Sequence, residues 1–161
     1  FMNKSDTILI IEDEMIIAAN ISLQLTNLGF KVDGIITKSE DVMPHLLVHI
    51  PDIILMDINL KGKTDGIELA QLIQKEYKII IVSRHYLGSI NHTLLTFEAL
   101  KNRKINIAGI IFSGDESKSS ESIILNKTGV KCIGRIEQEP YFDKNVIKEY
   151  ADLFRDNLLN V

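Results

Sequence analysis

The chain has one cysteine, Cys132, no tryptophan and three prolines among its 161 residues. A lone thiol cannot form an internal disulfide, which is typical of proteins in a reducing, cytoplasmic setting. No apolar run reaches the roughly 18–20 residues that span a bilayer, and no signal peptide opens the chain, so we expect no membrane partner. The formal net charge of −4 argues against a basic surface, and we also expect no nucleic-acid partner.

The chain is instead rich in short runs of Ile, Val and Leu. Hydrophobic residues make up 45% of it, and the apolar runs alternate with segments of helical periodicity from end to end. Uninterrupted apolar runs are typical of parallel strands that are buried on both faces. We therefore expect six strands, at residues 7–11, 31–36, 52–56, 78–82, 106–112 and 131–136.

Six strand–helix units predict a doubly wound, three-layer α/β/α sandwich, because parallel strands need right-handed helical crossovers. We expect one parallel six-stranded sheet of order 2-1-3-4-5-6, in a flavodoxin-like or P-loop-like arrangement. No Pro/Gly-rich linker interrupts the pattern. Residues 1–161 are therefore predicted to form a single domain with two halves, 1–83 and 84–161.

Several helix boundaries are marked by residues that suit them. Ser39 and Asp143 precede helical patterns, and their side-chain oxygens can accept hydrogen bonds from first-turn amides. Gly29 and Gly129 follow helical patterns, where glycine readily adopts the left-handed conformation of a helix end. We expect helices to begin or end at these four positions.

Three carboxylates directly follow two of the expected strands. Glu12 and Asp13 come after the first strand, and Asp57 comes after the third. Ligands of open parallel sheets bind beyond the carboxyl ends of the strands, at the switch point of the topology. If these two strands are neighbours, the carboxylates converge and repel one another. A hard divalent cation relieves that repulsion, and oxygen ligands with retained waters suit Mg²⁺.

The segments around these carboxylates form an ordered set. They are ILIIEDE at 8–14, PDIILMDINL at 51–60 and DGIEL at 65–69. In sequence and spacing they resemble the receiver domain of response regulators, and the resemblance covers about residues 6–83. It implies a small phosphodonor or a histidine kinase as partner.

The resemblance also implies roles for individual residues. Asp57 matches the phosphoacceptor of the family, and Glu12 and Asp13 match the residues that hold Mg²⁺ together with it. The backbone carbonyl of Asn59 is expected to be a further metal ligand. Ser83 matches the hydroxyl residue that contacts the phosphoryl group.

The strand expected at 106–112 departs from the receiver pattern. Receivers carry a lysine at the end of this strand and an aromatic switch residue within it, and neither is in register here. A missing cation removes stabilisation where phosphoryl charge develops. We therefore expect no signalling output, even if Asp57 is phosphorylated.

The second half carries a different pattern. Residues 82–96 read VSRHYLGSINHTLLT and resemble dethiobiotin synthetase, in which such a segment opens a helix. The resemblance extends over about residues 79–159. It implies a P-loop-type parallel α/β enzyme that uses ATP and Mg²⁺ to close a urea ring on a diamine with CO₂. The residues that it places on the substrate or nucleotide side are Gly88, Ser89, Asn91 and Ser113.

The phosphate loop of that family is absent from the sequence. Residues 57–64 end in Gly-Lys-Thr, as a P-loop does, but Asp57 stands where the first glycine belongs and would repel a nucleotide's phosphates. Phosphoryl transfer from ATP needs a cradle of backbone N–H groups, a lysine and a positioned Mg²⁺. We therefore expect that the chain is not an enzyme, and an ATP-dependent ligase is the weakest alternative.

Together, the two resemblances favour a chimera joined near residues 78–83. We expect an engineered protein, because Phe1 before Met2 is typical of a residue left by cloning. It is expected to retain the Mg²⁺ and phosphoacceptor site at Asp57. The main alternative is a natural, divergent receiver that acts in phosphorelay signal transduction.

Overall fold

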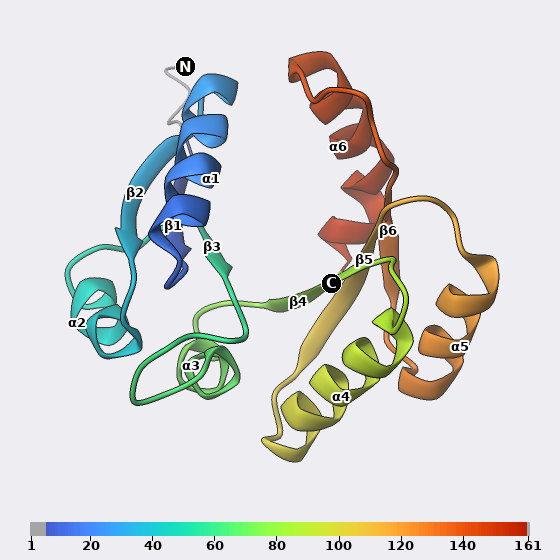
Figure 1. Cartoon of the computed structure of the whole chain (residues 1–161), viewed down its shortest axis with the longest axis horizontal. Helices are drawn as coiled ribbons and strands as arrows, with labels where there is room; N and C mark the ends of the chain where they lie inside the picture. Colours follow the sequence, from blue (N-terminus) through green and yellow to red (C-terminus); the bar gives the residue numbers. More distant parts are fainter. Residues whose placement is uncertain (1–5, 161) are drawn as a thin grey trace. The chain divides into compact units, whose positions relative to one another are not determined.

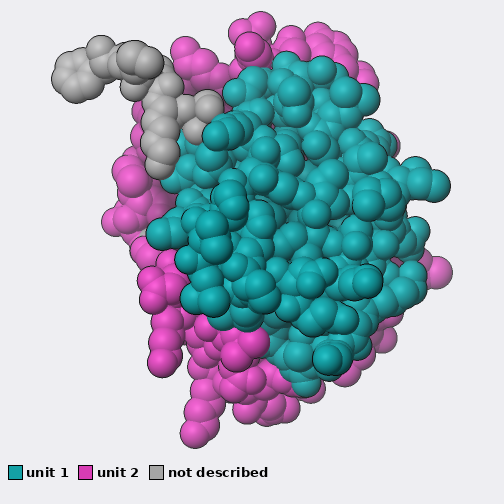
Figure 2. Space-filling view, turned by 90° about the vertical axis from the view of Figure 1, so that its left-hand side faces the viewer, with its two compact units in different colours: residues 1–69 teal, residues 70–161 magenta. Residues whose placement is uncertain are grey.

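The computed structural model describes residues 6–160, and the chain divides into two compact units, residues 1–69 and 70–161 (Figure 2). Each unit contains a three-stranded parallel sheet with helices beside it, so the chain is α/β, as predicted. Phe1, the expected cloning residue, lies outside the described residues.

The first unit is built on a sheet with strand order β2-β1-β3. The middle strand β1 (Thr7–Ile11) pairs with β2 (Lys31–Ile36) on one side and with β3 (Ile53–Met56) on the other. Residues 8–11 of β1, the middle strand of this sheet, are at most 3% exposed. The helical segments that begin in this unit are α1 (Met15–Leu28), the 3-10 turn η1 (Ser39–Asp41), α2 (Val42–Leu46) and α3 (Gly66–Ile73) (Figure 1).

A small apolar core holds the loops of this unit in place. It contains buried side chains from β1, β2, α2, α3 and the segment after β3, namely Leu9, Ile11, Ile36, Val42, Leu60 and Leu69. Burying one such side chain stabilises the fold by about 1.5–3 kcal/mol. Leu60 therefore anchors the loop that follows Asp57.

The second unit is built on a sheet with strand order β4-β5-β6. Its elements are β4 (Ile79–Arg84), α4 (Ser89–Asn102), β5 (Ile107–Ser113), α5 (Lys118–Thr128), β6 (Cys132–Ile136) and α6 (Lys144–Leu159). Helices α4 and α5 pack side by side, and α6 packs on β6 (Figure 1). Among the helices of the described chain, none is both long and apolar enough to cross a bilayer.

The helix boundaries follow their expected residues. Gly29 and Gly129 end α1 and α5 in the left-handed conformation, with φ of 96° and 67°. Asp143 caps the start of α6 with its side chain. Ser39 is the first residue of the 3-10 turn η1 and does not cap it with its side chain, and this turn leads into α2 at Val42.

The predicted single six-stranded sheet is not confirmed. Strands pair as β2-β1-β3 and as β4-β5-β6, and no pairing joins β3 to β4 within residues 6–160. A short apolar run indicates a strand but does not specify its neighbour. As outer strands, β3 and β4 are also more exposed than their apolar runs predict, and Val82 is 67% exposed. The assignment of the whole chain to one domain remains a prediction.

Candidate functional site

Three carboxylates meet where β1 and β3 end. Ile11 of β1 lies opposite Met56 of β3 in the parallel register, so the residues that follow the two strands leave the sheet at the same edge. One oxygen atom from each of Glu12, Asp13 and Asp57 lies within 4.8 Å of the other two. The structure thus brings together the three acidic side chains that the sequence singles out.

Backbone hydrogen bonds fix two of these residues. The Asp57 N–H donates to the Ile11 carbonyl at 3.0 Å, and Asp57 Oδ1 accepts a hydrogen bond from the Ile58 N–H at 2.8 Å. Glu12 Oε1 accepts a hydrogen bond from the Glu14 N–H at 3.0 Å. A backbone N–H thus orients Asp57 Oδ1 and Glu12 Oε1. The second oxygen of each of these two carboxylates is not held by these hydrogen bonds.

The first residue of α3, Gly66, lies against the backbone of Asp57 and Ile58. The Gly66 N–H donates to the Ile58 carbonyl at 3.0 Å, and a Cβ on Gly66 would lie 2.2 Å from the Asp57 carbonyl oxygen. A side chain cannot be accommodated there, so the approach requires glycine. Asp65 and Glu68 exchange hydrogen bonds between side chain and backbone, at 2.8 and 3.1 Å, in the pattern of a capping box. The close approach at Gly66 and the capping box of Asp65 and Glu68 explain why the segment 65–69 carries these three residues.

The Asp13 side chain of the cluster is nearly enclosed, with 7% of it exposed. The Lys61 Nζ lies 2.8 Å from Asp13 Oδ2. The ammonium group and the carboxylate therefore form an ion pair. The contact with Asp13 raises the pKa of Lys61, and the charges of Glu14 and Glu12 add to the effect. An enclosed oxygen beside two further carboxylates fits a hard cation such as Mg²⁺.

The two remaining residues of the predicted receiver site lie apart in the chain. Asn59 is exposed in the bend after Asp57. Ser83 lies in β4 of the second unit, where it is 4% exposed, and its hydroxyl is 2.7 Å from the Thr93 hydroxyl. The metal-ligand role of Asn59 and the phosphoryl contact of Ser83 both remain predictions.

The residues expected from the synthetase resemblance surround the start of α4 and the end of β5. Gly88, with φ of 98°, precedes α4, and the buried Ser89 is its first residue. Ser113 ends β5, and its carbonyl accepts a hydrogen bond from the His85 N–H at 2.8 Å. Asn91 is exposed and lines a surface depression of about 260 Å³ with Leu94, Leu95 and Glu98. A substrate or nucleotide role for these residues remains a prediction.

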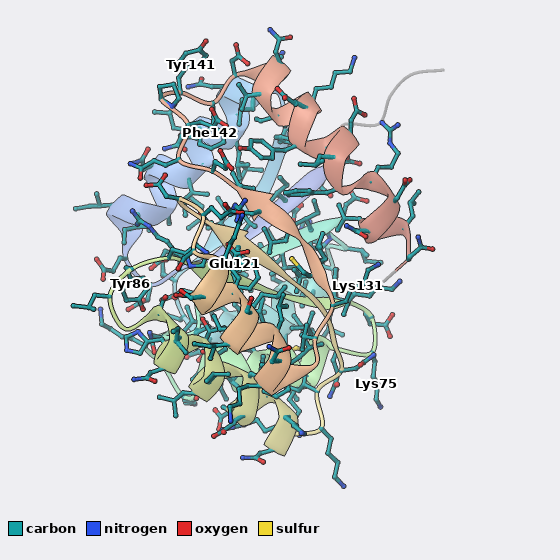
Figure 3. All side chains as sticks on the ribbon, turned by 90° about the vertical axis from the view of Figure 1, so that its right-hand side faces the viewer. Lys75, Tyr86, Glu121, Lys131, Tyr141 and Phe142 are labelled. Carbon is teal, nitrogen blue, oxygen red and sulfur yellow. The ribbon has the colours of Figure 1, made fainter. Side chains whose placement is uncertain are left out.

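The second unit also contains an ion-pair network that the sequence analysis missed. Glu121 of α5 (labelled in Figure 3) accepts a hydrogen bond from Arg135 Nη1 at 2.9 Å and lies 3.0 Å from His85 Nε2. Arg135 Nη2 donates to Glu116 at 3.1 Å. Burial alone would raise the pKa of Glu121, but the hydrogen bonds from Arg135 and His85 help to lower it overall. No sequence motif links these residues, which come from separate elements.

A second group that the sequence analysis missed lies in the first unit. Asp33, His45 and His49 have ligand atoms within 4.8 Å of one another. The spacing of the two histidines, four residues apart in a helical pattern, is the signal that could have revealed them. Nothing in the sequence pairs either histidine with Asp33 of β2.

Curated proteins similar to the chain are named as dethiobiotin synthetases. The chain is 59% identical over 93 residues to the ATP-dependent dethiobiotin synthetase of Christiangramia forsetii, which covers 58% of this chain and 45% of that protein. It is 45% identical over 84 residues to the enzyme of the same name from Cytophaga hutchinsonii, covering 52% of this chain and 41% of that protein. The chain thus spans less than half the length of these relatives.

Solved structures show a likeness of fold. A structure of RcsB dimers bound to DNA matches with a TM-score of 0.52 and 18% identity, covering 84% of this chain and 64% of that chain. At this identity the match supports the α/β fold and carries no conclusion about ligands or partners.

The prediction that the chain is not an enzyme is wrong. It rested on the missing phosphate loop, whereas the curated relatives, at 59% and 45% identity over the matched parts, are named as ATP-dependent enzymes. An AAA domain model also matches the chain. The absence of one loop from this sequence does not outweigh these similarities.

Two family models match overlapping parts of the chain. The model of the response regulator receiver domain matches residues 8–100, which include the three clustered carboxylates. The model of the AAA domain matches residues 59–146. Each match covers more than half of the 161 residues. The chain therefore belongs to the response regulator receiver family over residues 8–100 and to the AAA domain family over residues 59–146.

Proposed function

We propose that the chain is a chimera whose first unit accepts a phosphoryl group on Asp57. The observation that carries the proposal is the convergence of Glu12, Asp13 and Asp57 at the ends of β1 and β3. This convergence lies within the part of the chain that belongs to the receiver family. The phosphodonor that we assign is a small acyl phosphate or the phosphohistidine of a histidine kinase.

Asp57 acts as the nucleophile in this proposal. One carboxylate oxygen attacks the phosphorus atom of the donor, and the new O–P bond forms as the bond to the leaving group breaks. Oδ1 is held by the Ile58 N–H, so we assign Oδ2 as the attacking atom. The close backbone approach of Gly66 keeps the Asp57 main chain in place during the reaction.

The ligands that we assign to Mg²⁺ are the carboxylates of Glu12, Asp13 and Asp57 and the carbonyl of Asn59. When bound, Mg²⁺ stabilises negative charge on a transferring phosphoryl group. In the metal-free site, Lys61 places one positive charge at Asp13. We also assign to Ser83 a contact with the phosphoryl group.

The test is a titration of backbone amide chemical shifts with Mg²⁺ and then with beryllofluoride, a mimic of the phosphoryl group. We expect saturable shifts around Asp13 and Asp57 in the unchanged protein. Asp57→Asn should weaken Mg²⁺ binding and abolish the beryllofluoride response. The exposed Asp115 of the second unit provides the matched control Asp115→Asn. Unchanged Mg²⁺ affinity in Asp57→Asn would show that the acidic site is not the metal site.

A second candidate function is favoured by the 59% identity to a named dethiobiotin synthetase. The chain would then contribute to ATP-dependent closure of a urea ring on a diamine substrate. The test is product formation from the diamine, CO₂, ATP and Mg²⁺, measured against a protein-free blank. Turnover that is lost in Ser113→Ala or Asn91→Ala would assign this activity to the second unit, and turnover no faster than the blank would contradict it.

A further inference from the structure

Two histidines face one aspartate in the first unit, away from the residues assigned to phosphoryl transfer. His45 belongs to α2, His49 follows that helix, and Asp33 belongs to β2. His45 Nε2 lies 2.7 Å from Asp33 Oδ2, and His49 Nδ1 lies 3.5 Å from Asp33 Oδ1. Each imidazole therefore directs one ring nitrogen at the same carboxylate.

The backbone holds the two rings together. The His49 N–H donates to the His45 carbonyl at 2.9 Å, which continues the helical turn and places both side chains on one face. The rings are stacked, with centroids 4.5 Å apart and an angle of 13° between their planes. Gly34 lies next to Asp33, and even a Cβ at this position would lie 3.4 Å from His45 Cε1. The missing side chain at Gly34 leaves room for the His45 ring beside β2.

An ion pair alone does not account for this arrangement. One protonated histidine would be enough to neutralise Asp33, and two protonated rings stacked at this distance would repel each other. Three convergent ligand atoms, two nitrogens and one oxygen, are instead what a borderline-soft divalent cation binds. We propose that Asp33, His45 and His49 form a binding site for a transition-metal ion, with Zn²⁺ as the best-fitting ion.

One ligand atom from each of the three residues lies within 4.8 Å of the other two. Zn²⁺ bonds of about 2.0–2.1 Å to nitrogen and about 2.0–2.2 Å to oxygen place neighbouring ligand atoms about 3.3 Å apart. The 2.7 Å distance joins His45 Nε2 to Asp33 Oδ2, and the 3.5 Å distance joins His49 Nδ1 to Asp33 Oδ1, so each nitrogen lies near a different oxygen of the carboxylate. An imidazole binds a metal ion in the plane of its ring, so the two nearly parallel rings must turn away from their stacked arrangement to admit the ion.

Exposure supplies a route for the ion. The Asp33 and His45 side chains are 14% and 21% exposed, whereas His49 is 51% exposed. The ion can enter past His49, and water can complete the coordination on this open side. The two sites also differ in the metal ion that their ligands prefer. Imidazole nitrogens suit a transition-metal ion, whereas the all-oxygen acidic site at Asp57 suits Mg²⁺.

The test uses the full chain without a polyhistidine tag and Zn²⁺ alone as the ligand. Calorimetry measures the affinity, and ¹⁵N chemical shifts of the imidazole rings identify the ligands. We expect one ion per chain, with large shifts at His45 Nε2 and His49 Nδ1 and small ones at His85 and His92. Asp33→Asn and His49→Ala should each weaken binding at least tenfold, and His92→Ala provides the matched control.

Other outcomes would overturn the proposal. Affinity unchanged by His49→Ala would exclude the site, and His49 is exposed enough for that variant to fold. Binding that is lost in Asp57→Asn but retained in Asp33→Asn would place the ion at the acidic site. Binding that depends on Cys132 would place it at the thiol. Circular dichroism of each variant verifies that the fold is retained.

Discussion

Lys61 and a divalent cation are expected to compete for the same carboxylate oxygen. The Asp13 side chain is almost enclosed, and the Lys61 ammonium lies against its Oδ2 from a side chain that is 81% exposed. Because the pKa of Lys61 is raised by this contact, the lysine stays charged throughout the physiological range. A metal ion that binds Asp13 must therefore displace the lysine.

We predict that Lys61→Gln tightens Mg²⁺ binding. Exposed ion pairs are weak, so the gain should be modest, between about 1.5-fold and 5-fold. The measurement is the midpoint of the amide-shift titration with Mg²⁺ at constant ionic strength. Lys63→Gln removes the same charge from the same loop without removing the contact to Asp13, and it should have a smaller effect. Equal effects of the two variants would show that only the total charge matters.

At the scale of the element, α6 depends on a single capping side chain. Asp143 Oδ1 accepts hydrogen bonds from the backbone N–H groups of Asn145 and Val146 at 2.8 and 2.9 Å. We predict that Asp143→Ala lowers the free energy of unfolding by about 0.5–2 kcal/mol. Denaturant titration measures the change. Asp143→Asn keeps an acceptor oxygen and should retain most of the stability, and a loss as large as that of the alanine variant would contradict capping.

The network around Glu121 joins α5, β6 and the residue after β4. Glu121→Gln would leave Arg135 and His85 without their shared anionic partner. We predict a loss of about 1.5–3 kcal/mol of unfolding free energy near neutral pH, as for hydrogen bonds between charged groups. Glu98→Gln, at an exposed position of α4, is the control and should change stability little.

The pH dependence of this loss follows from the pKa shift. Folding lowers the pKa of Glu121, so the ionised carboxylate stabilises the folded state above the ordinary carboxyl pKa. This contribution is lost as the pH falls through the lowered pKa. The stability difference between the unchanged protein and Glu121→Gln should therefore shrink in acid. A difference that stays constant down to strongly acidic pH would argue against a role for the charge.

Local chemistry explains which elements could be predicted from the sequence. The six strands, the cap at Asp143 and the left-handed ends at Gly29 and Gly129 depend on residues close together in the chain. The carboxylates of the acidic cluster were also found, because they directly follow apolar strands. The contacts of Glu121 with Arg135, and of Asp33 with His45, join separate elements through folding alone. The predicted strand order agrees with the pairings β2-β1-β3 and β4-β5-β6, and only its pairing of β3 with β4 is not confirmed.

At the scale of the whole molecule, the receiver and AAA families share residues 59–100. Receivers carry a lysine at the end of their fifth strand and an aromatic switch residue within it. The corresponding strand of this chain, β5 (Ile107–Ser113), has neither residue at the matching position. A bound phosphoryl group can shift a conformational equilibrium only by interacting differently with its two states. We predict that beryllofluoride shifts amides around Asp13, Asp57 and Ser83 and leaves α4 and β5 nearly unchanged.

Amide chemical shifts of the full chain, with and without beryllofluoride and Mg²⁺, test this prediction. Asp57→Asn under the same conditions separates phosphoryl mimicry from non-specific effects of fluoride. Large shifts along α4 and β5, or dimerisation that depends on beryllofluoride, would favour a natural receiver that acts in a phosphorelay.

Helix α3 has a further consequence, because it begins in one compact unit and ends in the other. A genetic crossover within the codons of such a helix preserves its 3.6-residue periodicity, and the recombinant needs no new loop. Both family models match residues 59–100, and α3 lies within this stretch. Exchange of the coding sequence upstream of Gly66 for that of other receivers should therefore yield a library of recombinants, many of which fold.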